Sequence, residues 1–156
     1  MNERRRTATP VRLTLTSEFG ENLGGAWWQR TESVADELSG LADALEHRLG
    51  RVVDIQVSWS PWDGVPDLDL LTRRGVAAMP GLKDRPQRMM AVVGSDARVN
   101  LLVVPSRTTA NLALMILRRA VGLPVDAWHQ ESAAYSAAED IVRSAQVQCA
   151  RWQKTA

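Results

Sequence analysis

The chain contains only one cysteine and two histidines in 156 residues. A single cysteine excludes an internal disulfide framework and a cysteine-rich zinc site. The two histidines, His47 and His129, lie far apart, and neither has a second ligand at metal-binding spacing. Cys149 falls on an apolar stripe, which is typical of a small core residue with an inert thiol. We therefore expect no metal site and no cofactor.

Long apolar runs are also absent. No stretch approaches the ~18 consecutive apolar residues that a membrane span requires. Met1–Pro10 is charged but is not followed by an apolar segment, which argues against a signal peptide. We therefore expect a cytoplasmic protein with no membrane partner.

Sequence motifs of common catalytic sites are missing as well. The chain has no Gly-x-Ser-x-Gly elbow, no P-loop and no Gly-x-Gly-x-x-Gly motif. The sequence therefore designates no catalytic residue. A net charge of +1 argues against a surface that binds polyanions as a whole. Arg4–Arg6 still leave nucleic-acid association through the N-terminal arm as an alternative.

The residues that are present are typical of a globular protein, with 45% apolar and 24% charged side chains. This length suits one domain with a substantial core. We expect a flexible basic arm over 1–10, an α+β domain over 11–124 and a helical extension over 125–156.

The stretch 88–121 predicts the centre of the domain. Arg88–Val93 and Arg98–Val104 are strands that are apolar on both faces, which is typical of interior strands. A helix follows from about 109 to 121, capped by Ser106 or Thr108. The same helix start is also a possible anion site, because N–H groups and the helix dipole point there.

The rest of the domain is predicted from alternation and helical spacing. We expect a mostly antiparallel sheet of five or six strands packed by helices near 32–49 and 109–121. The remaining elements are a strand at Val11–Thr16, a loop at Gly20–Gly25, an amphipathic strand at Val53–Trp59, and a hairpin of 68–72 with 76–79.

A final helix is predicted from about Glu131 to Lys154. Its apolar stripe has heptad spacing and consists of Tyr135, Ala138, Val142, Ala145, Cys149 and Trp152. Two interpretations stay open. The stripe packs on the domain itself, or it pairs with a partner or a second copy through Tyr135, Val142, Cys149 and Trp152.

Tryptophans outnumber the other aromatic residues, and four of them fall in two motifs. These are Trp27, Trp28, Trp59 and Trp62, with Arg30 and Asp63 as polar neighbours. Large rings with a few polar groups are typical of a small-molecule pocket. Rings are equally typical of a core, so pocket and core are alternatives. Trp27 and Trp28 are adjacent, so they cannot both face the same side of a strand.

The order of these motifs resembles a family of small actinobacterial proteins grouped as a domain of unknown function. The resemblance rests on Gly25–Arg30, the leucine-rich helix, the segment from Trp59 to Trp62, and Leu101–Pro105. Gln29, Thr31 and Ser106 depart from the family's usual residues. The resemblance covers about 11–122 and implies a shared fold and an actinobacterial source, but no catalytic residue.

Together these patterns favour an uncharacterised, non-enzymatic binding or protein-interaction module, acting as a homodimer or with a protein partner. The alternative is a small-ligand binder or enzyme that uses the tryptophan motifs.

Overall fold

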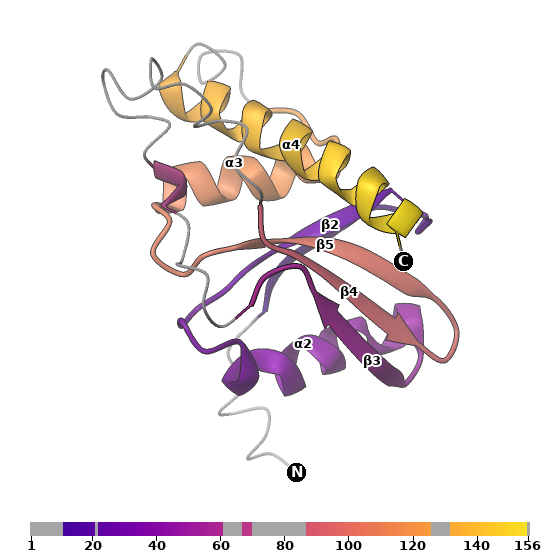
Figure 1. The fold of residues 1–156 in the computed structure, drawn as a ribbon. Helices are drawn as coiled ribbons and strands as arrows, with labels where there is room; N and C mark the ends of the chain where they lie inside the picture. Colours follow the sequence, from indigo (N-terminus) through magenta and orange to yellow (C-terminus); the bar gives the residue numbers. More distant parts are fainter. Residues whose placement is uncertain (1–10, 21, 61–66, 70–86, 126–131, 156) are drawn as a thin grey trace.

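The computed structural model describes residues 11–20, 22–60, 67–69, 87–125 and 132–155. Their five strands form one sheet in the order β1-β2-β5-β4-β3 (Figure 1). The elements are Arg12–Leu15 (β1), Leu23–Trp28 (β2), Val34–Leu49 (α2), Val52–Val57 (β3), Met89–Gly94 (β4), Arg98–Val104 (β5), Ala110–Ala120 (α3) and Ala133–Thr155 (α4). The predicted α+β fold is confirmed.

The sheet is mixed rather than purely antiparallel. β2 and β5 are parallel neighbours, with Ala26 opposite Leu102, and the other three strand pairs are antiparallel. Parallel strands need a long connection between them. Here α2, β3 and β4 lie between β2 and β5 in the sequence and supply that length.

β5 is buried on both faces, as its sequence predicts. Leu101 and Val103 pack against α2, whereas Leu102 and Val104 belong to the core beneath α3 and α4. Figure 1 shows α2 on one side of the sheet and the α3–α4 pair on the other. The molecule is therefore a three-layer structure with two apolar cores.

The apolar stripe of α4 packs inside the chain. Val142 and Cys149 are buried, and Tyr135 and Trp152 are partly buried against the same core as α3. A partner helix on these four residues would have to displace that packing. The interpretation in which the stripe packs on the domain therefore describes this structure.

Two polar contacts fix α4 in place. The Arg119 Nε of α3 lies 2.6 Å from a Glu139 oxygen of α4 in a partly buried ion pair. Farther along α4, the Gln148 side chain accepts a hydrogen bond from the Gln87 N–H and donates one to the Gln87 carbonyl, both at 2.7 Å. These bonds set the position of α4 along its axis, which apolar packing alone fixes weakly.

The predicted loop at Gly20–Gly25 is wrong at its end, because β2 begins at Leu23. The two glycines are needed for close approach rather than for a turn. A Cβ on Gly25 would lie 1.9 Å from the Thr14 carbonyl oxygen, and one on Gly24 would lie 2.5 Å from the Val99 side chain. Glycine inside a strand commonly marks such an approach.

The amphipathic strand predicted at Val53–Trp59 forms as β3, but its apolar side is not fully buried. Val53 is 56% exposed and Val57 is 42% exposed. A bulge between Val52 and Asp54 shifts the alternation of side chains. β3 also lies at the edge of the sheet, where α2 covers only part of the strand.

The N-terminal cap of α3 differs from the prediction, and a residue distant in the sequence contributes to it. Thr109 is the N-cap residue, rather than Ser106 or Thr108. The Asp69 carboxylate accepts hydrogen bonds from the Thr109 N–H at 3.0 Å and from its hydroxyl at 2.7 Å. The position suggested for an external anion therefore holds a carboxylate of the chain itself.

Some predictions fall on other parts of the chain. The basic arm, nearly all of the predicted hairpin, Trp62, Asp63 and His129 lie outside the described residues. Within the described part, no helix combines the length and the apolar character needed to cross a membrane.

We predict that Gly94→Ala strongly destabilises the protein, whereas Gly20→Ala does not. A Cβ on Gly94 would lie 2.1 Å from the Leu49 carbonyl oxygen, but a Cβ on Gly20 meets nothing within 4 Å. We expect Gly94→Ala to lower the free energy of unfolding by at least about 2 kcal/mol and Gly20→Ala to change it by less than about 0.5 kcal/mol. Urea unfolding measures both, and equal values would contradict the packing.

A second prediction concerns Cys149, which is fully buried. Burial raises the pKa of its thiol, and the charge of Arg98 and a hydrogen bond with Asn100 partly offset this effect. The folded state therefore keeps the proton at a pH where the unfolded chain loses it. This contribution is complete below the unfolded pKa and is lost as the pH rises through the folded pKa.

The difference in unfolding free energy between the wild type and Cys149→Ala should therefore shrink when the pH rises from 7 to above about 9. Urea unfolding at the two pH values measures it. A difference that stays constant would show that the thiol titrates alike in both states.

Candidate functional site

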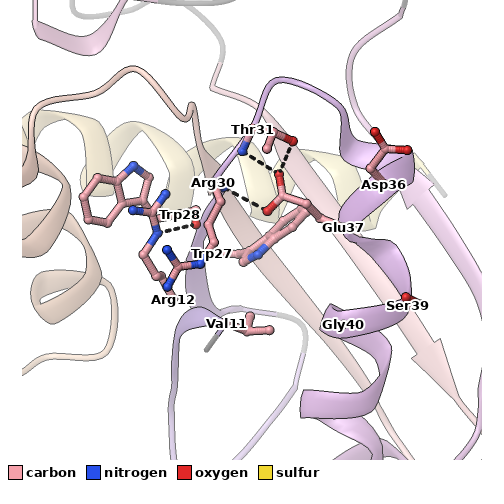
Figure 2. A pocket seen from close by; sticks show the side chains of 10 residues that line it. All are labelled: Val11, Arg12, Trp27, Trp28, Arg30, Thr31, Asp36, Glu37, Ser39 and Gly40. Atoms are coloured by element: carbon pink, nitrogen blue, oxygen red, sulfur yellow. Dashed lines mark hydrogen bonds between the residues drawn. The ribbon is translucent and has the colours of Figure 1, made fainter. Parts of the chain in front are cut away.

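A cleft of about 300 Å³ lies where β1, the end of β2 and the first half of α2 meet (Figure 2). Its walls combine aromatic rings, two guanidinium groups, two carboxylates and two hydroxyls. The lining residues are Val11, Arg12, Trp27, Trp28, Arg30, Thr31, Asp36, Glu37, Ser39 and Gly40. The volume is at the lower end of the range for small-molecule sites.

The strand geometry places the two tryptophans. Successive side chains of β2 point to opposite faces, so Trp27 packs under α2 and Trp28 joins the core on the α3 side. Trp27 is 1% exposed and Trp28 is 9% exposed. Both rings are therefore mainly core residues, and each contributes an edge or a face to the cleft.

Arg12 is held against Trp28 by the pairing of β1 with β2, which sets these two residues opposite each other. Its guanidinium carbon lies 3.6 Å from the centre of the Trp28 ring. Its Nε donates to the Trp28 carbonyl at 3.2 Å, and its Nη2 donates to the Gln29 carbonyl. Stacking and two carbonyl bonds together fix the plane of the guanidinium.

Arg12 is also close to a second cation. Partial burial lowers the pKa of Arg12, the charge of Arg30 lowers it further, and the charge of Glu37 acts in the opposite direction. An arginine remains protonated at any physiological pH. Two like charges therefore face the cleft, and an anion between them would relieve their repulsion.

Glu37 has a structural role at the entrance to α2. Its carboxylate accepts hydrogen bonds from the backbone N–H groups of Arg30 and Thr31 and from the Thr31 hydroxyl, all at 2.9 Å (Figure 2). Ser33 caps the same helix by accepting a hydrogen bond from the Asp36 N–H. These hydrogen bonds tie the loop between β2 and α2 to the first turns of the helix, beside Arg30.

The lining groups include guanidinium, carboxylate, hydroxyl and aromatic side chains. The ten residues include no histidine, cysteine or lysine. Across the described ranges of the chain, no cluster of three or more His, Cys, Asp or Glu side chains is arranged to hold a metal ion. A guanidinium fork beside an aromatic ring is, in contrast, a common device for recognising carboxylate or phosphate groups.

The predicted tryptophan site is only partly assembled here. Trp27, Trp28 and Arg30 line the cleft, but Trp59 does not. Trp59 follows β3, and β5 and β4 separate that strand from β2. Its ring packs partly against the core under α2, with the Arg88 guanidinium 4.7 Å from the ring centre. Trp62 and Asp63 lie outside the described residues.

Arg12 was not recognised in the sequence, where it appears as an ordinary polar position in an alternating strand. Its proximity to Trp28 depends on the β1–β2 register, which the sequence does not state. In the sequence, Glu37 is likewise one of several acidic residues of the first long helix, which are typical of a solvated face. A glutamate soon after a helix start that contains Ser33 was the available signal for its role.

Comparisons with known proteins agree with the resemblance seen in the sequence. A search of curated proteins and a search of solved structures found no significant match to the chain. The sequence profile of a family of unknown function (DUF5994) matches residues 11–120, a range that includes every residue of the cleft and ends before α4. The actinobacterial source stays a prediction. The chain belongs to this family of unknown function, DUF5994.

Proposed function

We propose that this protein acts by binding, and that its ligand is a small organic anion with a flat apolar part. The observation that carries this proposal is the pair of guanidinium groups at one cleft, with Arg12 stacked on Trp28 and oriented by two backbone carbonyls. Such a group is already placed before a ligand arrives, so little conformational entropy is lost on binding.

The charges around the cleft support an anionic ligand. The Glu37 carboxylate is occupied by three donors of the β2–α2 loop, so it forms part of the wall rather than a site for a cation. The charge of Arg30 disfavours the charge of Arg12, and Glu37 acts in the opposite direction. A carboxylate or phosphate group accepts bonds from both forks and offsets this repulsion.

The apolar lining supports the proposal that the ligand also has an apolar part. Trp27 and Trp28, although mostly buried, and the side chain of Val11 add apolar atoms to the lining beside the two cations. A ligand that combines an aromatic or conjugated group with one acidic group matches this arrangement. The small volume excludes a large cofactor from full enclosure.

We predict that benzoate binds and that benzamide, its neutral analogue of similar shape, binds at least about tenfold more weakly. A hydrogen bond to a charged group contributes about 1.5–3 kcal/mol, and the amide lacks the charge. Arg30→Ala should remove most of this preference, whereas Arg143→Ala, an exposed arginine of α4, should preserve it. Titration followed by tryptophan fluorescence measures the affinities. Equal affinities for both probes, or no binding of benzoate, would overturn the proposal.

A further prediction compares two arginines of matched geometry. Arg48 lies 4.1 Å from the centre of the Phe19 ring and donates to the carbonyls of Thr16 and Ser17, much as Arg12 contacts its own ring and carbonyls. Arg12→Ala and Arg48→Ala should each lower the free energy of unfolding by about 1–2 kcal/mol. Only Arg12→Ala should abolish benzoate binding. Loss of binding in both variants would assign the effect to stability alone.

A further inference from the structure

Among the described residues, β3 is the last strand at one edge of the sheet. It pairs with β4 on one side, and no other strand in the described ranges pairs with its outer side (Figure 1). An open edge presents backbone N–H and C=O groups that accept another strand. Two exposed valines, Val53 and Val57, lie on this strand.

The hydrogen-bond pattern identifies which backbone groups face outward. The Ser58 N–H donates to the Met89 carbonyl at 2.9 Å, and Val57 to Asp54 continue the pairing in regular register. Because hydrogen-bonded positions alternate along an antiparallel strand, 54, 56 and 58 bond to β4. The N–H and C=O groups of Ile55 and Val57 therefore point to the open side.

The sequence of β3 is nearly symmetrical about Ile55. It runs Val53, Asp54, Ile55, Gln56, Val57. When a second copy of the strand lies antiparallel to the first and is centred on Ile55, each valine faces a valine and each aspartate faces a glutamine. Asp54 and Gln56 share a face of the sheet, where the Gln56 amide already donates to Asp54 at 3.1 Å. A strand of this kind is complementary to an antiparallel copy of itself.

We infer that two copies of this chain associate through β3, antiparallel and with the two-fold axis at Ile55, to continue the sheet across both subunits. Each Val53 then faces the second copy's Val57, and each Asp54 faces Gln56. A shift that centres the pair on Asp54 instead would set two carboxylates opposite each other, which is unfavourable. The carboxylate pair disfavours the register centred on Asp54, and the valine–valine and aspartate–glutamine pairs favour the one centred on Ile55.

The bulge limits the strength of this association. It disturbs the strand before Asp54, so the regular open edge is short and the contact area is small. An interface of this size is typical of a weak, concentration-dependent dimer. The other edge strand, β1, is less suited to pairing, because it has four residues and none of its side chains is largely exposed.

Two double variants of the full chain test the pairing with the same loss of apolar surface. Val53→Lys with Val57→Lys places lysines opposite each other across the axis. Val53→Lys with Val57→Glu places each introduced lysine opposite an introduced glutamate. We expect the first variant to dimerise at least about tenfold more weakly than the second. Both positions are exposed, and circular dichroism shows whether each variant folds.

Light scattering coupled to size-exclusion chromatography measures the mass over a concentration series. The expected result is a dimer for the wild type and the lysine–glutamate variant, and a monomer for the double-lysine variant. A wild type that stays monomeric up to about 1 mM, or equal association of the two variants, overturns the inference.

Hydrogen exchange provides a second measurement that needs no substitution. The Ile55 and Val57 amides should exchange more slowly as the protein concentration rises, because they enter hydrogen bonds with the second copy. The Leu13 and Leu15 amides are the matched control. The Thr16 N–H donates to the Gly24 carbonyl, so alternation places these two amides on the open side of β1. Equal behaviour at both edges overturns the choice of β3.

Discussion

The burial of β5 on both faces constrains every other part of the molecule. A strand with apolar side chains on both sides needs a cover on each, and the chain supplies α2 for one face and α3 with α4 for the other. β2 pairs along one side of β5 and β4 along the other, so the outer strands β1 and β3 become the edges. The cleft and the open strand are both features of those edges, where helical cover is incomplete.

Patterns within single elements were enough to predict the centre of this fold. The double-sided apolar character of Arg98–Val104 identified an interior strand, and the leucine spacing before Gly50 identified α2. Features that depend on the neighbouring strands in the sheet could not be predicted from such patterns. Alternation in β3 suggested burial, yet its place at the edge leaves Val53 exposed. The glycines of β2 suggested a loop, yet they serve close contacts with β1 and β5.

The same distinction explains what could be predicted of the cleft. Trp27, Trp28 and Arg30 are close in sequence, so their proximity followed from chain connectivity alone. Grouping them with Trp59 required the strand order, and β5 and β4 intervene between β2 and β3. Arg12 meets Trp28 only through the register of β1 with β2. Single-sequence reasoning therefore finds the local part of a site and misses the contributions of paired strands.

The distribution of charge is the basis for proposing the cleft as the place of an external anion. Backbone N–H groups attract anions at the start of α3 and in the loop before α2. Asp69 fills the first position and Glu37 fills the second, so both are neutralised by the chain itself. Arg12, in contrast, donates its described hydrogen bonds to neutral carbonyls, and it lies beside another arginine. The cleft holds two guanidinium groups and the carboxylates of Asp36 and Glu37, and Glu37 bonds to backbone N–H groups. An anionic ligand beside Arg12 would therefore extend the same pattern of pairing.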